Sequence, residues 1–242
     1  MTIVTMYGHG LAGGDGPPGL DEHERTRCSA CVQRAHCLPA KLEGLALAEF
    51  GRSVTHLPAL SQGRTLVMEG EPFEAFYALK RGVLKAVRRE NDGDEQVTAF
   101  RFPGSVLGLA EQGNPVWTAT EVALTDAWIC RIPPRLVTPE LQRRLSNMAS
   151  TALRTEYERH LALAHRNAAQ RLAAMLVHFC EVMGSRQLSL PMSRADLASY
   201  LGMRQEALSR HFRHLILCGW IATHSRDIEI RELEGLRRFA DG

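Results

Sequence analysis

Long apolar runs are missing from this sequence. No stretch reaches the roughly 20 apolar residues that a membrane helix requires. The N-terminal segment MTIVTMYGHGLAGGDGPPGLDEHE also has no basic region followed by an apolar one, so it does not resemble a secretion signal. We therefore expect a soluble, cytoplasmic protein with no membrane partner.

Several signatures of catalysis are missing as well. The chain contains no G-x-x-x-x-G-K-[ST], no G-x-S-x-G and no H-E-x-x-H, the patterns of P-loops, hydrolase nucleophile elbows and zinc peptidases. Charge of one sign is not in excess either, because 29 Lys and Arg stand against 27 Asp and Glu. Such a balance can hide a basic DNA-binding module offset by an acidic one. We expect no enzymatic activity.

The cysteines are few but clustered. Three of the six lie in CSACVQRAHC, a C-x2-C-x5-C run formed by Cys28, Cys31 and Cys37. In a reducing compartment, clustered thiols more often bind metal than form disulfides. Spacing alone leaves two kinds of site open, an iron–sulfur cluster or a tetrahedral zinc site completed by Cys130 or His36.

The remaining three cysteines lie in different expected elements. Cys130 ends the last expected strand, where it can lie beside the segment that precedes the first strand, so it is the candidate for a fourth ligand. Cys180 and Cys218 lie on apolar helical faces and are interpreted as small buried hydrophobic residues.

The chain divides by composition into five segments. A Gly- and Pro-rich start predicts a flexible tail. Short β-prone runs separated by regularly spaced glycines predict an antiparallel roll. A glycine- and proline-free stretch after Pro139 predicts one long helix, followed by a small, mostly helical module. We expect an α+β protein with these parts: tail 1–27, cysteine segment 28–48, roll 49–137, long helix 138–167 and terminal module 168–242.

The terminal module contains a helix-turn-helix pattern. Ser193 is a plausible N-cap, Ala198 is small where two helices cross, and Gly202 supplies the turn. The segment WIATHSRDIEI predicts the two strands of a wing. Inward-facing positions are expected at Leu197, Leu201, Leu208, Phe212, Leu215 and Ile216.

The opposite face of the second helix carries groups that can read a major groove. Arginine can bind guanine, a carboxylate can accept from cytosine, and serine permits close approach. The expected DNA-binding residues are Gln205, Glu206, Ser209, Arg210 and Arg213.

Taken together, several motifs resemble the FNR branch of the CRP/FNR superfamily of transcription regulators. They are C-x2-C-x5-C followed by LPAKL, the roll segment GDEQVTAFRFPGSVLG, a strand ending in CRIP, the helix start NAAQRLAA, and Glu206-x2-Ser209-Arg210. The resemblance runs from about Cys28 to Ile230.

The resemblance implies a cofactor, partners and a signal. It implies a [4Fe-4S] cluster on Cys28, Cys31, Cys37 and Cys130, a homodimer paired through the long helix, and TTGAT-like inverted repeats in double-stranded DNA. RNA polymerase is an expected further partner. In this family oxygen attacks the cluster, the dimer loosens and specific DNA binding falls.

Matching to the family also suggests a dimer seam on the long helix. The seam is expected at Ala149, Leu153, Glu156, His160 and Leu163, where two copies of Glu156 would repel each other and keep the dimer marginal. Periodicity alone is equally consistent with Glu156 on a solvated face.

Two rival regulators are weighed on the same roll. A cyclic-nucleotide receptor needs a cation for the phosphate, and no arginine lies between Arg101 and Arg131; we expect no cyclic nucleotide to bind. A zinc-stabilised or haem-based regulator is the alternative, although haem leaves the cysteine run unexplained.

One residue departs from the family pattern. The position before the third cysteine, usually apolar, is His36. Its imidazole could donate a hydrogen bond to a cluster or cysteine sulfur and make oxidation harder; a side chain pointing to solvent is the plainer interpretation. His36 is the expected tuning residue.

Overall fold

The computed structural model describes residues 27–89, 93, 95–165, 167–224 and 227–242, with side chains at 158–160 and 162–165 outside the description. These residues form two compact units, one ending at Leu153 and one beginning at Arg154. Each unit is described separately below. Within the described ranges no helix combines the length and the apolar character needed to cross a membrane.

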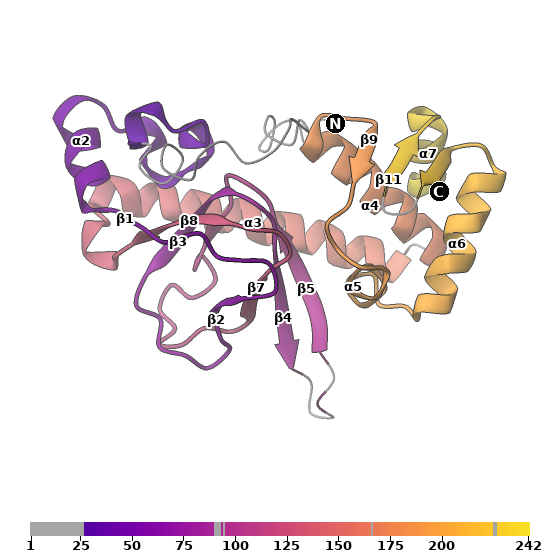
Figure 1. Cartoon of the computed structure of the whole chain (residues 1–242), viewed down its shortest axis with the longest axis horizontal. Helices are drawn as coiled ribbons and strands as arrows, with labels where there is room; N and C mark the ends of the chain where they lie inside the picture. The colour runs from indigo at the N-terminus through magenta and orange to yellow at the C-terminus, as the bar shows by residue number, and fades with distance from the viewer. Residues whose placement is uncertain (1–26, 90–92, 94, 166, 225–226) are drawn as a thin grey trace. The chain divides into compact units, whose positions relative to one another are not determined.

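The N-terminal unit begins with short helical segments (Figure 1). Three 3-10 turns carry the first three cysteines and the LPAK sequence, and the helix α2 follows. Their bounds are η1 (Cys28–Ala30), η2 (Arg34–His36), η3 (Leu38–Lys41) and α2 (Gly44–Ser53).

Two four-stranded antiparallel sheets form the roll that the sequence predicts. One has the order β1-β8-β3-β6 and the other the order β2-β7-β4-β5. The strands are β1 (Thr55–His56), β2 (Thr65–Val67), β3 (Phe76–Arg81), β4 (Leu84–Arg89), β5 (Glu95–Arg101), β6 (Val106–Leu107), β7 (Thr120–Ala123) and β8 (Trp128–Ile132).

The first sheet is buried on both faces. Side chains alternate along a strand, so Ile129 of β8 joins the core between the two sheets while Cys130 joins a second core. That second core packs the outer face of the sheet against α2, the cysteine segment and the start of the long helix. Its buried members include Leu38, Leu47, Phe50, Ala78, Leu141 and Leu145.

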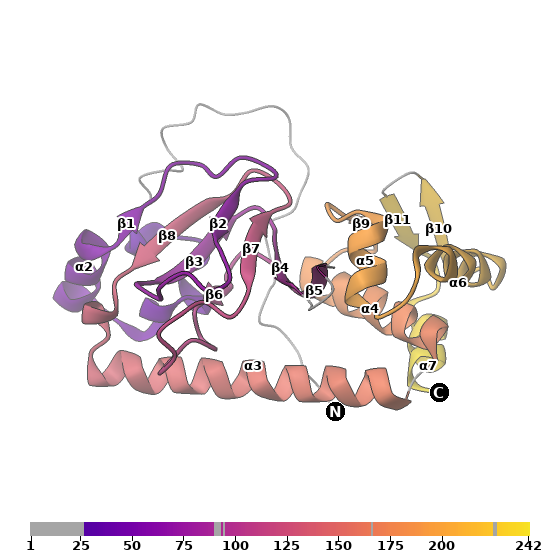
Figure 2. The same cartoon turned by 90° about the horizontal axis from the view of Figure 1, so that it is seen from below.

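The long helix is α3 (Pro139–His165), preceded by the 3-10 turn η4 (Pro134–Leu136). It is drawn as one uninterrupted helix (Figure 2). The absence of glycine and proline after Pro139 explains this continuity. The long helix that the sequence predicts after Pro139 is therefore present, and it ends at His165.

The C-terminal unit contains a helix-turn-helix and a three-stranded antiparallel sheet of order β10-β11-β9. The order of its elements is α4 (Ala168–Met183), β9 (Gln187–Ser189), α5 (Arg194–Tyr200), α6 (Gln205–Leu217), β10 (Ile221–His224), β11 (Asp227–Ile230) and α7 (Leu233–Asp241). Helix α4 starts at an Asn167 capping box with Gln170 and ends at Gly184, which has φ +60°. The predicted wing hairpin is present as β10 and β11.

Three details differ from the sequence expectation. Ile216 is 40% exposed rather than buried, because it lies at the edge of the apolar stripe formed by Leu208, Phe212 and Leu215. Cys218 is exposed because it ends α6 just before the turn at Gly219. Helix α7 was not predicted; it packs on α4.

Candidate cofactor pocket and nucleic-acid interface

The C-x2-C-x5-C run folds as consecutive tight turns. Cys28 begins η1, and the backbone N–H of Cys31 donates to its carbonyl. Cys37 lies between η2 and η3, and its N–H donates to the carbonyl of Gln33 at 3.0 Å. The next residue, Leu38, is fully buried and holds the segment against the roll.

Cys130 meets this segment from the roll. It occupies the middle of β8, where its cross-strand partners are His56 of β1 and Ala78 of β3. Only 8% of Cys130 is exposed, and it belongs to the core that faces the cysteine segment. Two strand pairings therefore fix the position of the fourth thiol.

One pocket brings the four cysteines together. Cys28, Cys31, Cys37 and Cys130 all line it, and the other lining residues are Gln33, Arg34, Pro39, Phe50, Val54, His56, Ala78, Leu79, Lys80, Gly104 and Ile132. All four thiols are free of disulfides. In the part of the chain that the structure describes, no three His, Cys, Asp or Glu side chains converge closely enough for a single metal ion.

The pocket disfavours bare thiolates. Burial, reinforced by Cys31, raises the pKa of Cys28, while Lys80 and Arg34 act in the opposite direction. Burial raises the pKa of Cys130 to about 12, again opposed by Lys80. Burial and the nearby Cys130 raise the pKa of Cys37 far above its usual range. The raised pKa values keep the thiols of Cys28, Cys37 and Cys130 neutral unless a bound cation compensates the charge of the thiolate.

The pocket also offers hydrogen-bond donors. The Nε of Arg34 is buried and has no hydrogen-bond partner among the described residues, while Nη2 of the same guanidinium donates to the carbonyl of Leu42 at 2.8 Å. The Nδ1 of His56 lies 3.3 Å from the sulfur of Cys130. Burial, and secondarily the positive charge of Lys80, lowers the pKa of His56.

These features fit an iron–sulfur cluster. A four-iron cluster takes four cysteine thiolates, and the complex then carries net negative charge. The pocket supplies four thiols, the cations Lys80 and Arg34, and the Nε–H of Arg34, which no acceptor in the described ranges occupies and which can donate to sulfur.

Two contacts anchor the cysteine segment. Arg144 of α3 donates from Nε to the Cys37 carbonyl at 2.9 Å and from Nη2 to the Ala35 carbonyl at 3.1 Å. Gly104 approaches the segment from the roll; a Cβ at this glycine would lie 3.1 Å from Gln33 Oε1 and 3.2 Å from His36 Cβ. The third cysteine is thus tied directly to the long helix.

Other residues singled out from the sequence lie elsewhere. His36 is partly buried beside Gly104 and is not among the residues that line the pocket. Cys180 is buried in α4 as expected, and Cys218 is exposed. Sequence reasoning missed His56, Lys80 and Arg144; only the strand register and the packing of α3 bring these residues to the cysteines.

The helix-turn-helix is built as the sequence predicts. Ser193 caps α5 through a reciprocal capping box with Asp196, with Asp196 N–H donating to Ser193 Oγ at 3.0 Å. Ala198 is buried at the crossing with α6. Gly202 has φ +61° in the turn, a conformation that favours glycine.

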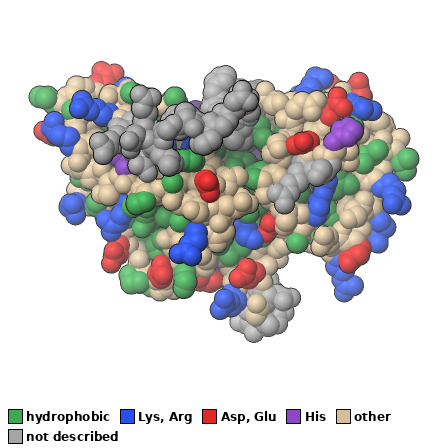
Figure 3. Space-filling view, viewed as in Figure 1, with side chains coloured by type: hydrophobic (Ala, Val, Ile, Leu, Met, Phe, Trp, Pro, Cys, Tyr) green, Lys and Arg blue, Asp and Glu red, His purple; other side chains and the backbone are tan. Residues whose placement is uncertain are grey.

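Helix α6 presents a polar face. Leu208, Phe212 and Leu215 are buried, and the guanidinium of Arg194 stacks 3.6 Å from the ring centroid of Phe212. Side chains expected to contact DNA are all exposed: Gln205, Glu206, Ser209, Arg210 and Arg213. Figure 3 shows basic side chains over α6, all of which are arginines because residues 154–242 contain no lysine. This face can bind phosphates and base edges.

The expected dimer seam is described only in part. Leu153 is 72% exposed, Glu156 is exposed and Ala149 is partly buried. His160 and Leu163 lie outside the residues whose side chains are described. Tyr157, which the sequence analysis did not select, is also exposed on α3.

Comparison with protein families decides the identity of the fold. The model of the Crp-like helix-turn-helix domain matches residues 170–239, and the model of the cyclic nucleotide-binding domain matches residues 58–144. The chain belongs to the CRP/FNR family. The α+β prediction, with roll, long helix and winged helix-turn-helix, is confirmed.

Named relatives of this CRP/FNR protein are transcription regulators. It is 28% identical to the transcriptional activator protein FnrA of Stutzerimonas stutzeri, over 90% of this chain and 94% of that protein. It is 25% identical to the fumarate and nitrate reduction regulatory protein of Escherichia coli, over 88% of this chain and 90% of that protein. The protein is therefore a DNA-binding regulator of the FNR type, in agreement with the prediction against catalysis.

A solved structure supports the same fold. FixK2 from Bradyrhizobium japonicum is 25% identical, with a TM-score of 0.71 over 77% of this chain and 96% of that chain.

Proposed function

We propose that this regulator senses oxygen through a [4Fe-4S] cluster held by Cys28, Cys31, Cys37 and Cys130, and that the cluster stabilises a DNA-binding dimer at low oxygen. The observation that carries the proposal is the single pocket that all four thiols line. The names of relatives, which include an anaerobic regulatory protein of Haemophilus influenzae, also support oxygen as the signal.

The cluster, when bound, supplies an oxygen-labile inorganic core. The chain's own residues would hold this core and connect it to the long helix. Lys80 and Arg34 place positive charge beside the cysteines, and Arg34 Nε is a donor to which no other described residue offers an acceptor. The two hydrogen bonds of Arg144 join the backbone on either side of His36 to α3. A change in the cysteine segment can therefore reach the long helix through one side chain.

We assign the dimer to α3. The proposed seam consists of Ala149, Leu153, Glu156, His160 and Leu163. A partner on α3 is supported by the exposed Leu153, Tyr157 and Leu161, because a row of large apolar side chains at four-residue spacing is better covered than left in water. Two facing Glu156 carboxylates would repel each other and keep the dimer only marginally stable, so that a small change at the cluster could shift the balance between monomer and dimer. TTGAT-like inverted repeats and RNA polymerase are the proposed macromolecular partners.

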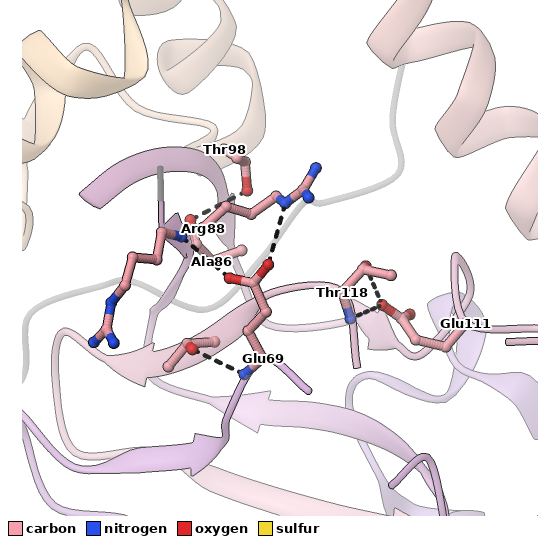
Figure 4. A network of polar contacts seen from close by, with 8 residues as sticks. Glu69, Ala86, Arg88, Thr98, Glu111 and Thr118 are labelled. Atoms are coloured by element: carbon pink, nitrogen blue, oxygen red, sulfur yellow. Dashed lines mark hydrogen bonds and ion pairs between the residues drawn. The ribbon is translucent and has the colours of Figure 1, made fainter. Parts of the chain in front are cut away.

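We propose that the roll takes no cyclic nucleotide, although it matches that domain family. The segment between Arg101 and Arg131 has no cation but holds two buried carboxylates. Glu111 accepts from Thr118 Oγ1 at 2.7 Å, and Glu121 pairs with Arg101 at 3.1 Å. Figure 4 shows Glu111 and, apart from it, Glu69 with its own hydrogen bonds. Residues 102–130 therefore offer no Lys, Arg or His side chain to neutralise a bound phosphate.

DNA binding before and after exposure to air tests the proposed function. Protein purified without oxygen should bind a TTGAT-type inverted repeat as a dimer. Air should convert it to a form that binds the same site at least about tenfold more weakly, a loss of about 1.4 kcal/mol. Equal binding in both states, at equal iron content, would rule out oxygen sensing through the cluster.

His36 remains the proposed tuning residue. We expect the cluster of His36→Leu to decay faster in air than that of the wild type, because the imidazole could withdraw charge from a sulfur. The measurement is the decay of visible absorbance after both proteins are loaded without oxygen. Equal decay rates would show that the imidazole does not protect the cluster.

A further inference from the structure

Besides His36, a second histidine, His56, lies beside a cysteine sulfur, although the two residues are far apart in the sequence. His56 and Cys130 are 74 residues apart in the chain, but they are direct cross-strand partners in the antiparallel pair of β1 and β8. Directly opposed residues point to the same face of a sheet. Their side chains therefore meet, with Nδ1 of His56 at 3.3 Å from Sγ of Cys130.

Burial and strand pairing hold the side chain of His56 next to the sulfur of Cys130. His56 is partly buried and lines the cysteine pocket. The strand β1 that carries it continues its pairing with β8 beyond the histidine, where the Leu57 N–H donates to the Ile129 carbonyl at 3.0 Å. Backbone hydrogen bonds on both sides of the contact thus hold imidazole and thiol together.

The chemistry fixes the direction of this hydrogen bond. A thiolate that ligates a metal has no proton, so it can only accept. The donor must therefore be an N–H on Nδ1 of His56, and a thiolate neighbour favours the ring form that carries this proton.

We infer that His56 donates an Nδ1–H hydrogen bond to the thiolate of Cys130, the one proposed ligand that comes from the roll. This hydrogen bond would raise the reduction potential of the cluster and slow the loss of its iron. This inference rests on the proposed function, since it requires the cluster. Donation draws charge from sulfur, which raises the reduction potential. Outer hydrogen-bond partners of this kind typically change metal affinity by about 10–100-fold.

The test compares two replacements of nearly equal shape. His56→Leu removes the donor, whereas His56→Asn keeps an N–H close to the place of Nδ1. We expect His56→Leu to lower the reduction potential and to lose iron to a chelator about tenfold faster without oxygen. His56→Asn should stay near the wild type in both measurements. Thermal unfolding of the metal-free proteins checks that both variants fold.

The outcomes separate the inference from the proposed function. If wild-type protein holds no iron and sulfide, the proposed function fails. If the wild type holds the cluster but His56→Leu keeps its potential and chelation rate, the inference is wrong. Equal changes in both variants would also overturn it, because the donor would then be irrelevant.

A measurement on folded wild type covers the case in which His56→Leu does not fold. Pulsed electron paramagnetic resonance of the reduced cluster, with 15N-labelled histidine, should detect a weak nitrogen coupling that disappears in His56→Asn. A spectrum unchanged by that replacement would contradict the hydrogen bond.

Discussion

Replacing Cys130 by serine is expected to abolish cluster assembly and, with it, oxygen-controlled DNA binding. Serine occupies almost the same volume, and its hydroxyl can still meet Nδ1 of His56, so the strand pairing should persist. What is lost is a thiolate, the ligand that iron–sulfur clusters use. Iron content after anaerobic reconstitution is the measurement, and it should fall from about four per subunit to near zero.

Cys180→Ser provides the matched control. Cys180 is a buried cysteine like Cys130, at 6% against 8% exposed, but it lies in α4 and is not among the residues that line the pocket. Its replacement should cost some stability through packing and leave iron content unchanged. Cys218→Ser, on an exposed residue, should change neither. A full cluster in Cys130→Ser would disprove the assignment of the fourth ligand.

Replacing Arg210 by alanine is expected to cost about 1–3 kcal/mol at the specific DNA site, or roughly 5- to 150-fold in affinity. Arg210 is exposed on the polar face of α6, which the buried Leu208 and Phe212 orient outward. A guanidinium there can form two hydrogen bonds with guanine. Binding to random DNA should change little, because phosphate contacts dominate it.

Titrations on specific and random DNA at two salt concentrations measure this effect. Arg52→Ala removes one charge from an exposed position on α2, in the other unit, and should leave both affinities nearly unchanged. If Arg210→Ala weakened specific and random binding equally, Arg210 would contact phosphate only. Glu206→Ala should relax preference at a neighbouring base pair.

The helix-turn-helix could be predicted because its signals are local. Ser193 as a cap, Ala198 at a helix crossing and Gly202 in a turn each depend on residues close by in the chain. Helix α7 was missed because Gly235 interrupts its pattern. The structure explains this glycine, since a Cβ there would lie 2.8 Å from Nε1 of Trp220.

The surroundings of the cysteines could not be predicted in the same way. The spacing of Cys28, Cys31 and Cys37 marks them as a group, but the contact between His56 and Cys130 depends on the register of β1 against β8. A shift of one residue would turn the imidazole to the other face. Arg144 reaches Cys37 across 107 residues through the packing of α3, for which the sequence carries no local signal.

Iron and acid-labile sulfide analysis of protein purified without oxygen tests the central claim most directly. We predict about four of each per subunit, with broad visible absorption that bleaches in air as sulfide is lost. A colourless protein with one zinc ion per subunit, or sharp haem bands without sulfide, would contradict the assignment of the pocket formed by Cys28, Cys31, Cys37 and Cys130.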